Sequence, residues 1–577
     1  MFRRLSPSKF RLLLPVVVTS MLTVCGIEPT ALAEEATQAP GASKQASTPD
    51  GLAEDPADTQ AAASHGTWVF RQSEITGGGL VTEIAVSPWT SGHATVGGDS
   101  WGLYNTRTSG NQWLPAMKSS PGNPMTGEQG TSYYSGLAYS KNPHQKNVVY
   151  GLLGRCGGKP GEGGFIAVEG DTVLRFNPNG PKGTESHCKR QHHPRPTGNR
   201  IVVDWDATAS KEYIYAAGGN GTGLWRSQNG GADWVNIGLA KKNEKPVITG
   251  MALVPGDNDS IVVTTRTSTI YVVSNIRSAA TGDAKVQTVD LGKTLAGLQF
   301  EEVTDIGGTL YAAARSHGIY TSKDGIHWSP TRGTIPSTVN VVTVGGNSSG
   351  SLVFAGCVAD KATPHCIYRT KDGGGSWAPV ADNPDFTEWG SNQKWWHSNL
   401  ASAMINGHSY VTSQIAVDKN GTTVYVAGRA GVWKSEHSGD SWRPAVVGLG
   451  GTMHHFVEWD GTFIETDDVD FYCEKSTPAD RFLVSSGIQN PPKGGCPAID
   501  AGPTKSLTTT FNNGATTVTV VPPSADGTPS KFLVNGKDEA TDWFRAQVIR
   551  PSDVLFHDGT LYIAQFGGGL VVGHQKQ

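Results

Sequence analysis

Residues 370–377 read TKDGGGSW, and the pattern of this stretch recurs along the chain at 103–113, 224–234, 319–328 and 432–442. The common form is an aromatic residue, a Ser or Thr two positions later and, after one further residue, Asp-Gly-Gly. A Trp follows three positions after the second Gly, and the acid is often replaced. In such a stretch the Ser or Thr ends a strand, Asp or Asn caps the turn through its own backbone, and Gly takes the positive-φ positions. We therefore expect a set of tight hairpin turns, each covered by its Trp.

The segments before these turns predict β-strands. Short alternating apolar stretches separated by Gly or Asn precede each turn, as at 303–322 and 414–435. Similar segments without the turn occur at 135–154, 248–274, 455–474 and 553–573. Repeats of roughly 40–60 residues with four strands each are typical of propeller blades. We predict an all-β fold, a β-propeller of four-stranded blades, as one large ring of about ten blades or as two associated rings. The last repeat is short, and the segment 66–72 is expected to complete it.

The composition excludes several functional classes. Charged residues make up 17% of the chain and the formal net charge is −4, so no basic surface for nucleic acid is expected. The sequence contains no P-loop or HExxH motif, and no Cys or His spacing typical of a metal site. We therefore predict no cofactor and no metal.

The N-terminus has the pattern of a secretory signal. A basic segment at 1–11 precedes an apolar run at 12–24, and Ala-Leu-Ala at 31–33 has the form of a cleavage site. The apolar run is too short for a retained membrane helix. Residues 34–65 are rich in small and polar types, which predicts a disordered linker. We expect a secreted, extracellular monomer with no membrane attachment after cleavage.

Cleavage would leave six of the seven cysteines, and an even number in a secreted chain favours disulfides. Their order favours local pairing, although about 15 connectivities are possible for six cysteines. The expected pairs are Cys156–Cys188, Cys357–Cys366 and Cys473–Cys496.

Two resemblances extend this interpretation. The repeated turn resembles the Asp-box, a hairpin motif of sialidases, sortilin-type receptors and several glycoside hydrolases. Residues 68–113 resemble the opening of glycoside hydrolase family 74, the secreted xyloglucanases, in a Trp-led strand, a Gly-Gly-Gly-Leu-Val-Thr turn and an Ile-Ala-x-x-Pro-like strand. An Asp-x-Gly-Gly-x-Tyr segment then carries the catalytic base in that family. The corresponding segment here is DSWGLY, which places Asp99 at the base position and Trp101 at one of the glycines.

A second block of the same family lies downstream. Residues 395–442 resemble its His-after-Trp, Ile-Ala-x-Asp and Gly-x-Gly-Val-Trp segments, which lead to the strand that carries the catalytic acid. Here that strand is followed by ETDDVD, so Asp467 or Asp468 falls at the acid position, with the family's glycines missing. The family has two seven-bladed propellers with the substrate cleft between them, and the residues after 442 are too few for a second such ring.

These carboxylates suit glycoside hydrolysis, which needs one carboxyl to protonate the leaving oxygen and another to activate water. Each acid ends a Thr- or Gly-containing strand just before an aromatic residue, a matching place in two repeats. The like charges of Glu465, Asp467, Asp468 and Asp470 would raise a carboxyl pKa, as a general acid requires. The alternatives remain open that these acids cap turns, lie in solvent or bind Ca²⁺.

Aromatic residues near these segments are candidates for stacking on sugars, although any one Trp is more often a core residue. A polar, turn-rich segment between repeats clusters Trp389, Trp395 and Trp396, followed by His397. Trp101 lies beside Asp99, and Trp459 precedes Asp467. The predicted substrate-binding residues are therefore Trp101, Trp389, Trp395, Trp396, His397 and Trp459.

We thus predict a signal peptide at 1–33, a linker at 34–65, propeller blades at 66–447, and further blades at 448–577 that complete the ring or form a second, smaller unit. By resemblance the function is an inverting glycoside hydrolase acting on a polysaccharide such as a β-1,4-glucan or xyloglucan. The alternative is a non-catalytic propeller that binds extracellular glycans or proteins.

Overall fold

The computed structural model describes the chain in segments, all within Asp55–Gln577. The described residues are 67–72, 81–98, 102–116, 133–154, 163–182, 200–218, 222–240, 246–265, 269–292, 297–358, 367–380, 404–405, 408–409, 412–428, 431–445, 449, 453–459, 462–467, 471–474, 482–484, 506–512, 514–524, 528–548, 551–557, 559–565 and 569–576.

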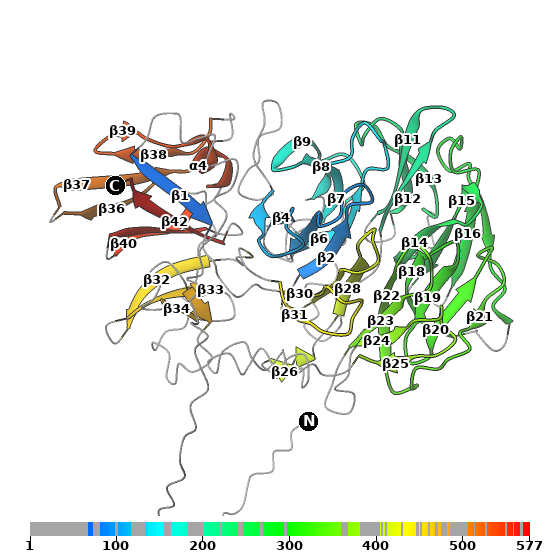
Figure 1. Cartoon of the computed structure of the whole chain (residues 1–577). Helices are drawn as coiled ribbons and strands as arrows, with labels where there is room; N and C mark the ends of the chain where they lie inside the picture. Colours follow the sequence, from blue (N-terminus) through cyan, green and yellow to red (C-terminus); the bar gives the residue numbers. More distant parts are fainter. Residues whose placement is uncertain are drawn as a thin grey trace, which may run out of the picture. The chain divides into compact units, whose positions relative to one another are not determined.

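The fold is an all-β assembly of antiparallel sheets, as predicted, and nearly every sheet has four strands (Figure 1). Seven of these sheets come from the middle of the chain. They are β2 (Val81–Val86), β3 (Ala94–Gly98), β4 (Leu103–Thr106) and β5 (Leu114–Pro115); β6 (Tyr133–Tyr139), β7 (Val148–Gly154), β8 (Gly164–Glu169) and β9 (Thr172–Asn177); β10 (Ile201–Asp206), β11 (Lys211–Gly218), β12 (Gly223–Ser227) and β13 (Val235–Gly238); β14 (Ile248–Val254), β15 (Asp257–Thr265), β16 (Ile270–Ser274) and β17 (Lys285–Thr288); β18 (Phe300–Asp305), β19 (Leu310–Ala314), β20 (Gly318–Ser322) and β21 (Ser329–Pro330); β22 (Asn340–Gly346), β23 (Val353–Val358), β24 (Ile367–Thr370) and β25 (Ala378–Pro379); and β28 (Thr412–Val417), β29 (Val424–Gly428), β30 (Gly431–Ser435) and β31 (Arg443–Pro444).

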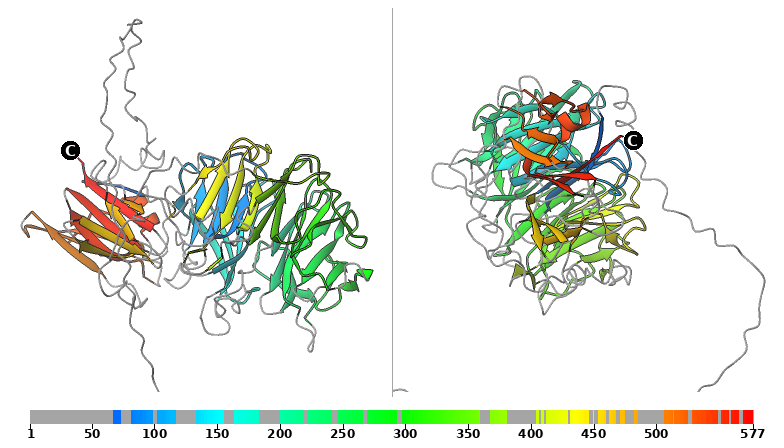
Figure 2. Two further views of the ribbon diagram at one scale, coloured as in Figure 1. Left: turned by 90° about the horizontal axis from the view of Figure 1, so that it is seen from below. Right: turned by 90° about the vertical axis from the view of Figure 1, so that its left-hand side faces the viewer.

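These seven sheets form a closed ring. The first strand of each sheet contacts the first strand of the next, from β2 through β6, β10, β14, β18 and β22 to β28, and β28 contacts β2 again. Figures 1 and 2 show the blue sheet that begins with β2 beside the yellow sheet that begins with β28. A direct hydrogen bond of 2.6 Å joins the Ile84 N–H to Gln414 Oε1 across this closure. Among the described residues, seven sheets therefore follow one another in a closed circuit of contacts.

Three further four-stranded sheets lie outside this circuit of seven. They contain β32 (Met453–Trp459), β33 (Thr462–Asp467), β34 (Phe471–Glu474) and β35 (Phe482–Val484); β36 (Leu507–Phe511), β37 (Thr516–Val521), β38 (Lys531–Val534) and β39 (Lys537–Asp538); and β40 (Pro551–His557), β41 (Thr560–Gln565), β42 (Gly569–Gln575) and β1 (Trp68–Gln72). The short helix α4 (Asp542–Gln547) and the small hairpin of β26 (Met404–Ile405) and β27 (His408–Ser409) are the remaining elements of the described segments.

The first strand of the chain completes its last sheet, as the sequence predicted. β1 pairs antiparallel with β42 in a register that sets Trp68 opposite Gln575. The reason is burial: Trp68 and Phe70 are almost completely buried among Phe532, Phe544 and other residues of the final two sheets. Trp68 and Phe532 meet edge to face, with 5.4 Å between their ring centroids. This arrangement adds about 0.5–1.5 kcal/mol to burial alone.

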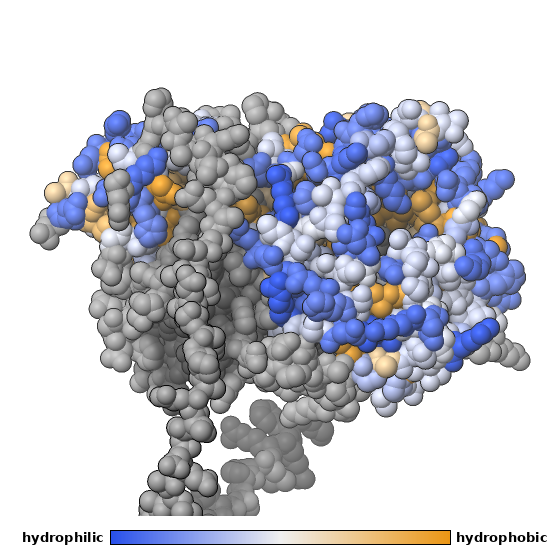
Figure 3. Space-filling view, in the orientation of Figure 1, coloured by the Kyte–Doolittle hydropathy of each residue, from blue (hydrophilic) through white to orange (hydrophobic). Residues whose placement is uncertain are grey.

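Blades of the ring bury both faces, which explains their continuous apolar strands. In β2, Ile84 belongs to the cluster shared with the β28 sheet, whereas its neighbour Ala85 belongs to the cluster shared with the β6 sheet. Successive side chains of a strand point to opposite faces, so consecutive apolar residues serve two interfaces. The exposed large apolar side chains among the described residues are only Val69, Leu174 and Val286, and the surface of the ring in Figure 3 is accordingly mostly hydrophilic.

The repeated turn has the local geometry that its sequence predicts. In the copy after β12, Ser227 Oγ accepts from the Gly231 N–H at 2.9 Å, and Asn229 Oδ1 accepts from the Asp233 N–H at 3.0 Å. Gly231 has a φ of +82°, and the Trp234 indole N–H donates back to the Gly231 carbonyl at 3.0 Å. The hydroxyl-to-glycine bond recurs at Thr106, Ser322, Thr370 and Ser435.

The same turn joins neighbouring blades. A Cβ on Gly231 would lie 1.9 Å from the Phe165 ring of the preceding sheet, and one on Gly439 would lie 2.6 Å from the Phe354 ring. The turn glycine therefore has two reasons to be glycine, its positive φ and the close approach of an aromatic ring. The motif is thus structural: it closes a hairpin and fits that hairpin against the preceding blade.

Candidate functional site

The loop that carries Asp99 joins the second and third strands of the first blade. β3 ends at Gly98 and β4 begins at Leu103, and the Gly98 N–H donates a long 3.5 Å hydrogen bond to the Gly102 carbonyl. Asp99 and Trp101, predicted as base and stacking residue, lie outside the described residues. The structure therefore describes the strand ends on both sides of this predicted site.

The predicted acids lie at the corresponding place of another sheet. β33 ends at Asp467, and β34 begins at Phe471 after a segment that contains Asp468 and lies outside the described residues. Asp467 pairs with Met453, the first residue of β32, and the register shifts before the next pair. Gly98 pairs in the same way with Val81, the first residue of β2, before the same kind of shift.

Of the predicted substrate-binding residues, Trp459 lies within the described segments. Trp459 is the last residue of β32 and pairs with Thr462, and only its backbone is described. Trp389, Trp395, Trp396 and His397 lie outside the described residues. Cys357, in β23, is disulfide-bonded, and its predicted partner Cys366 also lies outside the described residues, so the pairing stays a prediction.

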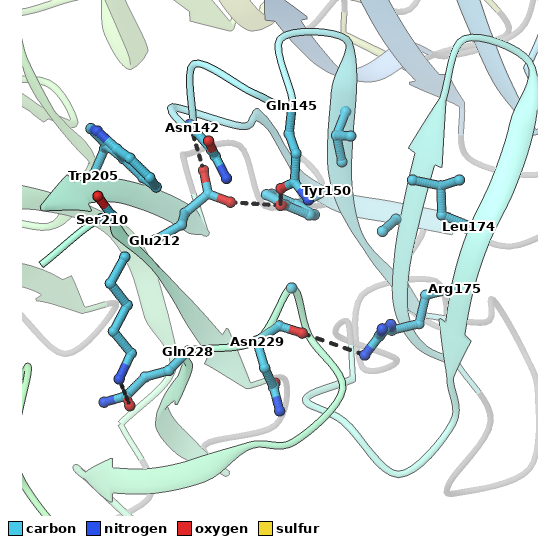
Figure 4. Close-up of a pocket in the computed structure, with 14 residues that line it drawn as sticks. Asn142, Gln145, Tyr150, Leu174, Arg175, Trp205, Ser210, Glu212, Gln228 and Asn229 are labelled. Carbon is cyan, nitrogen blue, oxygen red and sulfur yellow. Dashed lines mark hydrogen bonds between the residues drawn. The ribbon is translucent and has the colours of Figure 1, made fainter. Parts of the chain in front are cut away.

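Elsewhere, the structure contains a cavity that the sequence did not predict. It measures about 300 Å³ and lies between the second and third blades (Figure 4). The second blade contributes Tyr150, Leu174 and Arg175, and the third contributes Trp205 and Glu212. Asn142, Gln145, Ser210 and Asn229 come from the connections and turns at the same end of the strands.

Glu212 holds the two blades together at this cavity. Its Oε1 accepts from Ser140 Oγ at 2.7 Å, the Lys141 N–H at 2.7 Å and the Asn142 N–H at 3.0 Å. Its Oε2 accepts from the Tyr150 hydroxyl at 2.7 Å. Burial, reinforced by the adjacent Glu212 carboxylate, raises the pKa of Tyr150, so this hydroxyl stays a neutral donor. A nearly buried carboxylate with four donors is a rigid support, and it preforms the cavity.

A second group of polar side chains lines the inner strands of the ring. Bulges in β2, β18 and β28 place Glu83, Glu302 and Gln414 at matching positions. Gln414 bonds the next blade through the Ile84 N–H, and Glu302 Oε2 accepts from the Val344 N–H at 2.9 Å. Glu83 is fully buried, and its carboxyl oxygens have no hydrogen-bond partner in the described part of the chain. Burial raises the pKa of Glu83 well above its usual value, against the opposing effect of Arg200.

The described segments contain neither a cluster of metal-ligating side chains nor a membrane-spanning helix. No group of three or more His, Cys, Asp or Glu side chains there could hold a metal ion. No helix in those segments has the length and apolar character needed to cross a lipid bilayer.

Sequence reasoning missed the cavity residues for a physical reason. Glu212 stands in an ordinary Lys-Glu-Tyr stretch at the start of a strand, and its four donors come from residues about 60–70 positions earlier that only packing of the blades brings close. Trp205, which pairs with Glu212 across the sheet, gave the only sequence signal, an aromatic residue in a polar strand end.

Comparison with known proteins gives the fold class. No family model matches the sequence, and no curated protein matches it. Solved structures do match the chain. The GH74 xyloglucanase from Xanthomonas campestris gives a TM-score of 0.53 and 14% identity over 88% of this chain and 100% of that one. The GH74 enzyme of Niastella koreensis gives a TM-score of 0.50 and 16% identity over 87% of this chain and 73% of that one. The chain therefore has a β-propeller fold like that of glycoside hydrolase family 74, as the sequence resemblance predicted.

Proposed function

We propose that this protein is a secreted glycoside hydrolase that cleaves a polysaccharide, a β-1,4-glucan such as xyloglucan, by an inverting mechanism. The observation that carries the proposal is the matching register of two strand ends. Gly98 and Asp467 occupy equivalent pairing positions, and in the sequence Asp99 and Asp468 come directly after them. The propeller likeness supports the same assignment, because the sequence blocks that resemble the family lead to these two residues.

In the proposed reaction Asp468 is the general acid and Asp99 is the general base. Asp468 transfers its proton to the glycosidic oxygen as the bond to the anomeric carbon breaks. Asp99 takes a proton from a water molecule, whose oxygen attacks the anomeric carbon from the opposite face. This sequence inverts the anomeric configuration and requires carboxyl groups about 6.5–9.5 Å apart. The acidic residues beside Asp468 support its role, since like charges favour the protonated form.

The pairing register of β33 with β32 favours Asp468 over Asp467 as the acid. Asp467 is the last residue of β33 and takes part in the pairing with β32, in the place that Gly98 holds in β3. Trp101 and the segment that contains Trp389, Trp395, Trp396 and His397, together with Trp459, are proposed to line the substrate path. We further propose cleavage of the signal peptide after Ala33, a disordered linker at 34–65, and a monomer without cofactor.

Hydrolysis of xyloglucan and of mixed β-glucans by the purified chain tests the proposal, with the released anomer followed by proton NMR. Asp99→Asn and Asp468→Asn are expected to reduce kcat by at least about a hundredfold each, since general acid–base catalysis contributes about 10²–10⁴-fold. Asp467→Asn is the matched control and should retain most of the activity. Full activity in Asp99→Asn, or release of the retained anomer, would contradict the mechanism. A chain that binds these glycans and hydrolyses none of them would favour the non-catalytic binding module.

A further inference from the structure

The cavity between the second and third blades has the composition of a ligand site and lies away from the predicted catalytic loops. Its residues lie at the connections between first and second strands, such as 142–148 and 206–211, and at the turn after the third strand. Asp99 instead follows the end of a second strand, β3. These are opposite ends of the strands, so the cavity and the predicted active site belong to different faces of the ring.

One wall of the cavity carries an aromatic side chain and the opposite wall carries the cation Arg175. The other cation of the lining, Lys211, donates to Gln228 Oε1 at 2.5 Å. Trp205 is half-buried on β10, and Leu174 and Arg175 on β9 lie across the cavity from it (Figure 4). Leu174 is 43% exposed, one of few large apolar side chains of the described residues that water reaches. An apolar side chain and an indole ring on facing walls suit the C–H faces of a sugar ring or another flat, partly apolar group.

Arg175 lacks the ion pair that several other arginines of the ring form within the described residues. Arg277, Arg369 and Arg443 each pair with a carboxylate, at 2.5, 2.6 and 2.9 Å. Among the described residues no carboxylate lies within ion-pair distance of Arg175, and its one hydrogen bond is a long 3.5 Å contact to the Asn229 carbonyl. The only carboxylate in the lining, Glu212, already accepts from four donors. The guanidinium therefore retains its capacity to bind an incoming carboxylate in a bidentate pair.

The amide side chains supply the rest of the recognition. Asn142 and Gln145 both line the cavity, and Gln145 Oε1 makes only a long 3.4 Å contact with the Tyr150 hydroxyl. An amide carries both donors and an acceptor, which is the complement of a pair of adjacent hydroxyl groups. The volume of about 300 Å³ is at the lower end of the range of small-molecule sites and limits the ligand to a short one.

From these contacts we propose that the cavity is an accessory binding site for the acidic end of a saccharide, a uronosyl residue with its neighbour. The sugar ring lies against Trp205 and Leu174, Arg175 binds the carboxylate, and Asn142 and Gln145 bind hydroxyl groups. The site does not catalyse; it holds a branch or an end of a glycan on the face of the ring opposite the proposed active site. The Glu212 hydrogen bonds keep this cavity open in the absence of ligand.

Calorimetric titration tests the site with the full chain carrying Asp99→Asn, so that hydrolysis does not interfere. The probes are a glucuronosyl-glucose disaccharide and, as its neutral counterpart, cellobiose. We expect the uronosyl probe to bind at least about tenfold more tightly, the size of one charge-assisted hydrogen-bonded contact. Arg175→Gln should remove this preference, and Trp205→Leu should lower the affinity for both probes. Arg332→Gln, which removes an exposed arginine outside the cavity, is the matched control.

Three results would overturn the site. The first is absence of binding by the uronosyl probe, the second is equal binding in Arg175→Gln, and the third is tighter binding of a short peptide with a free C-terminal carboxylate. Thermal unfolding of each variant checks that the fold is kept. The assay measures binding alone, so a chain that hydrolyses xyloglucan without binding the probe refutes this site and leaves the proposed function intact. The reverse outcome refutes hydrolysis and leaves the site.

Discussion

The indole N–H of Trp113 donates a 2.8 Å hydrogen bond to the Ala445 carbonyl. It connects the turn of the first blade with the last blade of the ring. Lys434 makes the same connection from the other side: its Nζ donates to the Ser109 carbonyl at 2.6 Å and to Asn111 Oδ1 at 2.7 Å. The Lys434 side chain is fully buried. The closure of the ring therefore depends on a buried lysine as well as on apolar packing.

Replacement of Lys434 by Met tests this closure. The variant removes the donor of the Ser109 carbonyl and leaves Arg443 as the donor to Asn111 Oδ1, so the loss should be about 2 kcal/mol. Lys371→Met is the control, since that lysine is 59% exposed and pairs only with Asp440 at 3.2 Å. Thermal unfolding followed by near-UV circular dichroism should show a clear decrease in Tm for the first variant alone. Equal Tm values for the two variants would show that the ring closes without the lysine.

The two neighbouring glycines of one turn provide a second test. Gly230 and Gly231 both have positive φ, at +64° and +82°. A Cβ on Gly230 meets nothing within 4 Å, whereas a Cβ on Gly231 meets the Phe165 ring at 1.9 Å. Gly230→Ala should therefore cost only the left-handed backbone strain, about 1–2 kcal/mol, and Gly231→Ala should cost about 1–3 kcal/mol more from overpacking. Urea unfolding measures both, and a similar loss in the two variants would argue against the turn as a contact between blades.

Glu83 predicts a pH dependence of stability. Its raised pKa means that the folded chain binds this proton more tightly than the unfolded chain does. Its contribution to stability is therefore fully present below the unfolded value of about 4.3 and is lost as the pH rises through the folded-state pKa. Glu83→Gln, which stays neutral, should match the wild type in acid and exceed its Tm as the pH increases. Glu169→Gln, at an exposed position of β8, should show no such divergence, and parallel curves for wild type and Glu83→Gln would refute the prediction.

Asp372 predicts the opposite dependence. Hydrogen bonds from Thr370 and Ser376 lower the pKa of Asp372 to about 2. Its contribution is present above the unfolded value of about 3.9 and is lost as the pH falls through the folded value. The Tm difference between wild type and Asp372→Asn should therefore shrink between about pH 4 and pH 2. Asp283→Asn, at an exposed position, controls for the loss of a surface carboxylate, and a difference that stays constant over this range would contradict the assignment.

The sequence by itself determined the local structure. The hydroxyl, acid and glycine of TKDGGGSW form a hairpin turn through hydrogen bonds within five residues. One of them is the 2.9 Å bond that the Gly374 N–H donates to Thr370 Oγ1. Alternation of apolar residues determined the strands, and the Trp-led segment at the start determined that β1 completes the last sheet. These features depend on contacts that are near in the chain, or on an apolar surface too large to leave exposed.

Only the tertiary structure decided the number of blades in the ring and the position of the cavity. Ring closure depends on how each sheet packs against its neighbour, and the repeat pattern contains no signal for the blade at which β28 meets β2. The cavity likewise exists because Glu212 meets Ser140 and Tyr150 across two blades. Contacts between residues distant in the chain follow from the packing of whole sheets, since no local sequence pattern encodes which strands become neighbours.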